Sequence, residues 1–370
     1  MRQFSFYLYE NYDPEREANR PDLPRKVLGA HVNKVCALLT EGKLHPAELE
    51  PDFLASLEAI GLLRSSGEGI FFDCPVFLRQ DAAPLRTVLE TQAAICVEKL
   101  MGFWQEFSAC CAKIQNGRSV RENLYHILCG MLFDGLFFDF LSASGAVSTS
   151  RVHPTGLDYL LIVYERCAEL DALSRSLLCS YNRFSNGKCA LQSFGDSRGC
   201  RWDFYRFFRG LEENMTSPRY GAEKELLFGL EGDCLEDKKA YVLQQVLSLV
   251  QSGRCDRGVE ALLERFRYWH NGQFMVPVYL PQHRPVILEL ETMLEGLLGT
   301  EIRRALASCA GAGELTAVAH GVNPLELANE LYHLLFGAIN GMLVSKGLVL
   351  APPDYPGEGC YRKSIQIDSW

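Results

Sequence analysis

The chain lacks the short motifs that mark several kinds of catalytic and cofactor site. Its 370 residues contain no G-x-G-x-x-G after a strand, no P-loop and no H-E-x-x-H. Its fourteen cysteines include no C-x-x-C pair, although structural zinc sites and thioredoxin-like motifs both need close pairs. We therefore expect a protein that is not an enzyme and has no cofactor and no metal site.

Basic residues are also in short supply. Thirty-seven Lys and Arg face forty-six Asp and Glu, for a formal charge of −9. Nucleic-acid binders draw much of their affinity from cations that neutralise phosphates, so a general nucleic-acid binder is disfavoured, although a single face can still be basic. The same charge argues against docking on anionic membranes.

Long uncharged apolar runs are missing as well. The most apolar segments, 124–141 and 331–350, both carry charged residues and fall short of a span of about 20 residues. The N-terminus has too short an apolar run for a signal peptide. Several cysteines lie inside apolar helical patterns, where a free thiol acts as a small hydrophobe. These features predict core helices in a reduced, cytoplasmic protein.

What the chain does contain is one stretch that occurs twice. Residues 124–130, Leu-Tyr-His-Ile-Leu-Cys-Gly, return at 331–337 as Leu-Tyr-His-Leu-Leu-Phe-Gly. Both copies are apolar at helical spacing, so each predicts a buried helix at the centre of its own module. We call residues 124–130 and 331–337 the two motif segments.

Further matches occur in the same order along the chain. Residues 72–78 resemble 274–280, and 154–165 resemble 356–367. Phe204-Tyr205 also echoes Phe6-Tyr7 of a predicted N-terminal strand. Such a set predicts an internal duplication with halves 1–185 and 186–370.

The first half places a helix at 27–39, a short helix after Pro46, a helix at 51–63 and a hairpin within 62–78. This order, with Ile60-Gly61-Leu62 before the hairpin, resembles the winged-helix family. The resemblance implies a mainly helical α+β fold, with two winged-helix-like halves each followed by long helices. In that family the helix before the wing often enters the DNA major groove.

The second copy is the better candidate for DNA contacts. The helix before the first wing is acidic, whereas bases outnumber acids in the second copy. An ordinary solvated helix face is the alternative interpretation. The candidate nucleic-acid contacts are Arg254, Arg257, Arg265, Arg267 and His270.

Duplicated modules tend to pack on one another about a pseudo-two-fold axis. The motif segments are natural partners in such packing, since Gly130 and Gly337 allow close approach. Their histidines could form a paired metal or proton-sensitive site, or could be ordinary core histidines bonded to backbone. The candidate contacts between the halves are Tyr125, His126, Gly130, Tyr332, His333 and Gly337.

Residues 198–209 interleave arginines with aromatic residues. This pattern fits stacking on single-stranded nucleic acid. It also fits a core element whose arginines reach the surface. The similarity of Phe204-Tyr205 to Phe6-Tyr7, in a segment without those arginines, favours this second interpretation.

Three functions are compatible with the sequence. The first is a non-enzymatic interaction or regulatory protein whose tandem modules bind another macromolecule, with a protein as the favoured partner. The second is a DNA-binding transcriptional regulator that uses the second winged-helix unit. The third is a small-ligand or metal-binding protein with a site between the halves.

Overall fold

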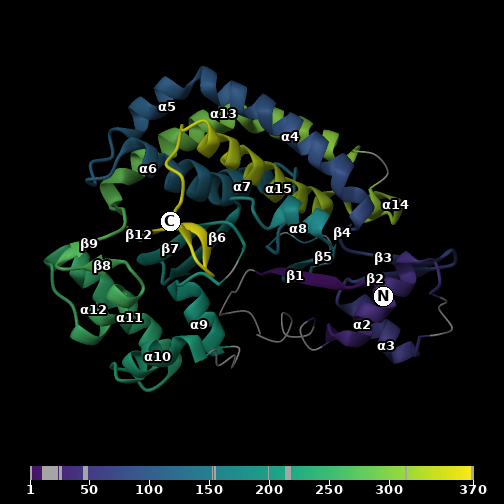
Figure 1. The fold of residues 1–370 in the computed structure, drawn as a ribbon, viewed down its shortest axis with the longest axis horizontal. Coiled ribbons are helices and arrows are strands. Elements are labelled where there is room, and N and C mark those ends of the chain that lie inside the picture. The colour runs from purple at the N-terminus through teal and green to yellow at the C-terminus, as the bar shows by residue number, and fades with distance from the viewer. Residues whose placement is uncertain are drawn as a thin grey trace. The chain divides into compact units, whose positions relative to one another are not determined.

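The structure is a computed structural model that describes residues 2–10, 24, 27–44, 49–151, 153, 156–198, 200–212, 218–312 and 315–367. Helices dominate this part of the chain, and the strands form several small sheets (Figure 1). The prediction of a mainly helical α+β protein is confirmed.

The chain divides into two compact units, and neither is continuous in sequence. Unit 1 comprises Met1–Leu100, Phe137–Ser176 and Glu295–Ile339, and unit 2 comprises Met101–Leu136, Leu177–Leu294 and Asn340–Trp370. A single cut near residue 185 therefore does not separate them, and each unit draws on both predicted halves. The physical reason is that two long helices cross the boundary. One end of α13 (Arg284–Ala310) and of α15 (Pro324–Ser345) belongs to unit 1, and the other end belongs to unit 2.

Unit 1 contains the predicted helix, helix and hairpin of the first half. Its sequence forms α2 (Ala30–Thr40), α3 (Pro51–Ala59) and the paired strands β2 (Leu63–Ser66) and β3 (Gly69–Phe72). The short helix expected after Pro46 falls on 45–48, outside the described residues. Gly61 follows the C-cap residue of α3, and its φ of +68° lets the chain turn into the hairpin.

A three-stranded sheet completes the strand content of unit 1. The strands β1 (Phe4–Glu10), β5 (Tyr159–Glu165) and β4 (Val76–Phe77) lie in the order β1-β5-β4, with β5 antiparallel to β1 and parallel to β4. All of β5 is buried, so this strand is the centre of the sheet. The helices assigned mainly to unit 1 are α4 (Arg79–Gly102), α7 (Phe137–Ala143), α8 (Ala168–Ser174) and α14 (Thr316–Ala319).

Unit 2 repeats the helix, helix and hairpin with the second half of the sequence. Its elements are α11 (Leu235–Ser252), α12 (Arg257–Arg265), β8 (Trp269–His270) and β9 (Gln273–Phe274). The turn between β8 and β9 is Asn271-Gly272, and both residues have positive φ, 48° and 78°, as Asn-Gly hairpin turns require.

The sheet of unit 2 has the order β10-β12-β7-β6, with a short extra strand β11 on β12. Its central strands β12 and β7 are antiparallel, while β10 is parallel to β12. The strands are β6 (Ser180–Ser185), β7 (Cys189–Gly195), β10 (Val278–Tyr279), β11 (Asp354–Tyr355) and β12 (Gly359–Ile367). The other helices of this unit are α5 (Trp104–Cys111), α6 (Val120–Leu124), η2 (Tyr125–Leu136), α9 (Phe204–Glu212), η3 (Pro218–Tyr220), α10 (Gly221–Phe228) and η4 (Pro281–His283).

The two sheets share one hydrogen-bond register. Val76 lies opposite Val163 in unit 1, and Val278 lies opposite Ile365 in unit 2. The N–H of Val163 donates to Pro75 O at 2.8 Å, and the N–H of Ile365 donates to Pro277 O at 2.9 Å. These are the positions that the sequence comparison aligned, so the matches in this region reflect equivalent structure.

One predicted match is wrong. Phe204 and Tyr205 lie in helix α9 and not in a counterpart of the N-terminal strand. The counterpart of β1 is β7, which pairs antiparallel with β12 as β1 pairs with β5. Phe204 and Phe207 belong to the buried core of unit 2, so the aromatic residues of the 198–209 segment are core side chains, as the structural interpretation expected.

Each motif segment packs on the sheet built from the other half of the sequence. In unit 2, Tyr125 Oη donates to Phe194 O of β7 at 3.2 Å. In unit 1, the ring of His333 stacks on Tyr9 of β1 with centroids 5.0 Å apart. The repeated helices are therefore exchanged reciprocally between the two halves of the sequence.

One helical stretch, Val120–Ala143, is long and apolar enough to cross a membrane by length and composition alone. Its most apolar window is 67% buried inside the protein, as in the core helix of a globular protein.

Candidate functional site

Unit 2 contains a cavity of about 340 Å³ beside the N-terminal end of β12. This volume lies at the lower end of the range typical of small-ligand sites. The wall combines aromatic and apolar side chains with five basic and two acidic ones. The lining residues are Glu122, His126, Glu264, Arg267, Trp269, His270, Met275, Val276, Pro277, Pro353, Tyr355, Tyr361, Arg362 and Lys363.

His126 comes to the wall on helix η2, which is wound as a π-helix over Tyr125–Leu136. π-Helical turns are rare and often occur at functional sites. The side chain of His126 is 3% exposed, and its Nε2 has no hydrogen-bond partner among the described residues. Burial, with the nearby cations Arg362 and Arg118, lowers the pKa of His126 to about 3. The imidazole is therefore neutral at physiological pH.

The equivalent His333 has a different environment. Its Nδ1 lies 2.8 Å from Asn329 O, one turn back on the α-helix α15. This is the core histidine bonded to backbone that the sequence analysis considered. The two histidines thus share a sequence position, while His126 alone lines the cavity of unit 2.

Arg362 and Lys363 enter from strand β12, on opposite faces because strand side chains alternate. Arg362 Nη2 donates to Ala351 O at 2.9 Å, and its Nη1 lies 3.9 Å from Glu122. Arg362 Nε is buried without a hydrogen-bond partner among the described residues. Lys363 is 7% exposed and donates through Nζ to Phe266 O.

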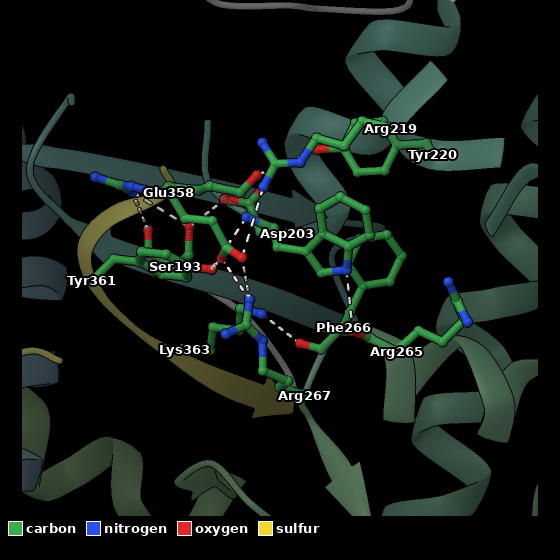
Figure 2. Close-up of polar contacts among 12 residues, drawn as sticks. Ser193, Asp203, Arg219, Tyr220, Arg265, Phe266, Arg267, Glu358, Tyr361 and Lys363 are labelled. Carbon is green, nitrogen blue, oxygen red and sulfur yellow. Dashed lines mark hydrogen bonds and ion pairs between the residues drawn. The ribbon is translucent and has the colours of Figure 1, made fainter. Parts of the chain in front are cut away.

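A network of polar contacts fixes the cationic side of the cavity (Figure 2). The Glu358 carboxylate accepts two hydrogen bonds from Arg267 Nη2, at 2.7 and 2.5 Å, and one from the Tyr361 hydroxyl. The Arg267 guanidinium also lies over the Tyr355 ring, 4.2 Å from its centroid. Arg267 is consequently held by a charge-assisted pair and by an aromatic face.

A second part of the network anchors β7 and the start of α9. Asp203 Oδ2 accepts from Ser193 Oγ at 2.6 Å (Figure 2). Asp203 Oδ1 accepts from the N–H of Arg206 at 2.8 Å. Arg201 is fully buried and donates to Asp196 O and Ser193 O. These bonds place the first turn of α9 against the sheet.

The buried environment changes the proton affinity of Lys363. Desolvation, followed by the nearby Arg267 charge, lowers its pKa to about 7, while Asp203 and Glu358 act in the opposite direction. The Lys363 ammonium also faces the rings of Tyr268 and Tyr361, at 5.2 and 5.5 Å from their centroids.

Unit 1 has a cavity at the equivalent position, but it is almost closed. Its volume is about 10 Å³, roughly the space of one water molecule. Leu157 and Leu161 line it where unit 2 has Gly359 and Lys363, because Val163 of β5 corresponds to Ile365 of β12. Leu157 packs on Gly61, its Cδ1 lying 3.1 Å from where a β-carbon of residue 61 would be. This leucine, absent from unit 2, accounts for the closed space.

The five predicted nucleic-acid contacts do not act as one free basic surface. Arg265 is paired with the buried Glu223, and Arg267 with Glu358. Arg254, Arg257 and His270 are exposed. Arg267 and His270 line the cavity of unit 2.

The six predicted inter-half contacts fall into two groups, one in each unit. Tyr125 and Gly130 both meet Phe194, with Cγ 3.2 Å from where a β-carbon of Gly130 would be. Tyr332 stacks on Phe138, with ring centroids 5.4 Å apart. Gly130 thus permits close approach of a strand residue, in place of the twin helix that the sequence analysis expected.

The pair Arg362-Lys363 is the part of the site that sequence reasoning missed. Alignment of 356–367 with 154–165 sets these cations against Leu160 and Leu161, both buried in unit 1. A charged pair within an apolar strand was the available signal.

Residues 195–199 spell Gly-Asp-Ser-Arg-Gly, the spacing of a nucleophile elbow. An elbow requires the serine on a direct turn from strand to helix. Here β7 ends at Gly195 and α9 begins only at Phe204. No hydrogen bond joins Ser197 to a histidine among the described residues, so the local geometry does not match this motif.

Within the part of the chain that the structure describes, no group of three or more His, Cys, Asp or Glu side chains is arranged to hold a metal ion. Comparison of the chain with protein-family models, with curated proteins and with solved structures finds no match.

Proposed function

We propose that this protein is a non-enzymatic regulatory protein that binds a small molecule in the cavity of unit 2. The observation that carries the proposal is the contrast between the two copies of one structural position. Where unit 1 closes the space with leucines, unit 2 keeps a cavity of about 340 Å³ with charged and aromatic walls.

The charged walls are costly for stability, which supports a functional role. Placing Arg362 and Lys363 where the first copy has Leu160 and Leu161 replaces apolar burial by partial desolvation of two cations. The first copy shows that this fold tolerates leucines at both positions. Polar groups kept in a concave apolar setting are typical of ligand sites.

DNA binding through α12 has weaker support. Two of the five arginine and histidine candidates are held by carboxylates of the same unit, Glu223 and Glu358. A DNA-reading face normally combines several phosphate contacts with base-edge contacts. Binding of a protein partner, the first possibility from the sequence, remains compatible with a ligand-controlled role.

A thermal-shift screen tests the proposal. The full-length protein is heated with a library of small acids, bases and neutral compounds, beside the variant Val276→Phe. Val276 lines the cavity, so the larger ring fills part of it. We expect stabilising compounds for the natural protein and loss of their effect in the variant. A library without hits, or hits that Val276→Phe retains, would contradict the proposal.

A further inference from the structure

We infer that the cavity of unit 2 takes a small carboxylate with an apolar or aromatic body, bound through His126 and Arg362. This inference rests on the proposed ligand-binding function and names the chemistry of the ligand.

Two buried side-chain nitrogen atoms at the cavity lack hydrogen-bond partners among the described residues. His126 Nε2 and Arg362 Nε are buried, have no partner among the described residues and belong to side chains that line the same cavity. Arg362 Nε always carries a proton, and a neutral imidazole with its proton on Nε2 is also a donor. Buried donors without partners are rare in folded proteins and call for an acceptor. With the His126 proton on Nε2, a ligand that satisfies both atoms must bring acceptor oxygens.

The positive charge of Arg362 at the cavity wall favours an anionic ligand. Arg362 Nη1 is 3.9 Å from the Glu122 carboxylate, longer than a direct charge-assisted hydrogen bond. Lys363, on the opposite face of β12, also lines the cavity, but its lowered pKa leaves Arg362 as the permanent charge of this pair. An acceptor group that is itself negative gains from the Arg362 charge, whereas an ammonium ligand would be repelled by it.

The number of donors and the nature of the wall favour a carboxylate over a phosphate. A carboxylate offers two oxygens, which match two donor sites, while phosphate sites usually gather more donors or a helix N-terminus. The wall also contains several apolar and aromatic side chains, among them Trp269, Val276 and Pro353. Such walls suit the body of an organic acid and would leave a phosphate with little solvation.

The protonation state and environment of His126 also support this ligand class. It remains neutral because it is buried beside cations, so its contact with the ligand is a hydrogen bond and not an ion pair. The histidine of the other motif segment, His333, is bonded to backbone and lines neither cavity. Of the two equivalent histidines, His333 has this bond to backbone, and no such bond is seen for His126 among the described residues.

The test is isothermal titration calorimetry on the full-length protein. The probes are phenylacetate and hexanoate, beside phenylacetamide, phenethylamine and inorganic phosphate. We expect both carboxylates to bind, the amide to bind roughly tenfold to hundredfold more weakly, and the amine and phosphate not to bind.

Two variants locate the contact. Arg362→Met keeps the length of the side chain and removes its donors, and His126→Phe keeps a ring of similar shape. Each should weaken carboxylate binding roughly tenfold or more. Arg254→Met is the matched control, since Arg254 is exposed and outside the cavity, and it should leave the affinity unchanged.

The melting temperature separates a binding role of His126 from a structural one. Because Nε2 has no protein partner to lose, His126→Phe should melt without ligand at or above the temperature of the natural protein. A marked loss of stability, or undiminished carboxylate affinity in both variants, would overturn the inference. Suppose that carboxylates do not bind, but that neutral or cationic compounds do, and that Val276→Phe abolishes their binding. In that case this inference fails while the proposed function stands. If none of the five compounds binds, this inference fails, and the proposed function fails with it only when the thermal-shift library also gives no hit.

Discussion

Lys363 is a single residue whose burial makes an unusual contribution to stability. Its folded-state pKa of about 7 lies below the ordinary value of 10.5. Between these pH values the unfolded chain holds a proton that the folded protein has released. The free energy of unfolding therefore gains from this residue as pH rises from about 7 to about 10.5, and the residue is most costly below pH 7.

The variant Lys363→Met removes this titration. We expect it to raise the free energy of unfolding by roughly 1–3 kcal/mol at pH 6, after allowance for the lost bond to Phe266 O. The gain should shrink steadily toward pH 10. Denaturant titrations of both proteins at several pH values measure the difference, in which other titrating groups cancel. A difference that does not change with pH would show that Lys363 keeps its proton when buried.

Arg267 adopts a backbone conformation that favours glycine. Its φ is +59°, and the equivalent residue in unit 1 is Gly61, with φ of +68°. Gly61 and Arg267 both follow the last turn of the helix before the hairpin, and their N–H groups donate to Glu58 O and Glu264 O at 2.9 Å. The side chain of Arg267 offsets the backbone strain through Glu358 and Tyr355.

Two substitutions separate backbone from side chain at this position. Arg267→Ala and Arg267→Gly both lose the contacts of the guanidinium, but only glycine relieves the positive φ. We expect the glycine variant to be more stable than the alanine variant by about 1 kcal/mol, the reverse of their order in a helix. Chemical denaturation measures the two free energies of unfolding. An alanine variant of equal or greater stability would contradict the backbone strain.

At the scale of elements, the same motif forms two kinds of helix. In α15 it is part of an α-helix of 22 residues. In the first copy it forms the π-wound η2, which ends in a kink where Asp134 and Gly135 leave helical geometry. The glycine after an aspartate is free to take this conformation.

Close packing of η2 on the sheet gives a prediction for Gly130. An added methyl group would lie 3.2 Å from Phe194 Cγ, so the ring would have to move. Gly130→Ala should lower the free energy of unfolding by roughly 1–3 kcal/mol. The control is Gly341→Ala on α15, which is exposed with nothing within 4 Å and should gain roughly 0.5–1 kcal/mol. Thermal or denaturant unfolding compares them, and a tolerated Gly130→Ala would show that β7 can shift away.

The elements themselves were largely predictable from sequence. Helical spacing and the glycine before the hairpin identified α2, α3 and the β2–β3 hairpin, because these signals are local. The aromatic run at Phe204 misled, since aromatic residues fit strands and helices alike and the buried helix face decided the outcome. The winged-helix resemblance itself remains a prediction.

The site was predictable only in part, for a physical reason. His126, Arg267 and His270 stood out for their position in the repeat or their charge. That they line one cavity depends on which segments pack together, and periodicity shows a buried face without naming its partner. Arg362 could have been found by asking which equivalent positions exchange apolar for charged side chains.

At the scale of the whole molecule, duplication predicts two similar modules but leaves open which copy supplies each helix. The structure assigns the first motif segment to the unit with the second sheet, and the second motif segment to the unit with the first sheet. Neither half of the sequence therefore contains a complete unit. Buried contacts such as Asn340 Nδ2 to Cys129 O, at 3.1 Å, join residues far apart in the chain.

This exchange predicts how fragments behave. Residues 1–176 and 177–370 each keep one sheet and lack the motif helix that covers it, so neither fragment alone should unfold with a sharp cooperative transition. Expressed together, they should co-purify in equal amounts, because each supplies the helix that the other lacks. Size-exclusion chromatography and thermal unfolding of the separate and combined fragments measure this. A fragment that folds cooperatively by itself would mean that a half can cover its sheet with its own motif helix, and the reciprocal arrangement would then not be required for stability.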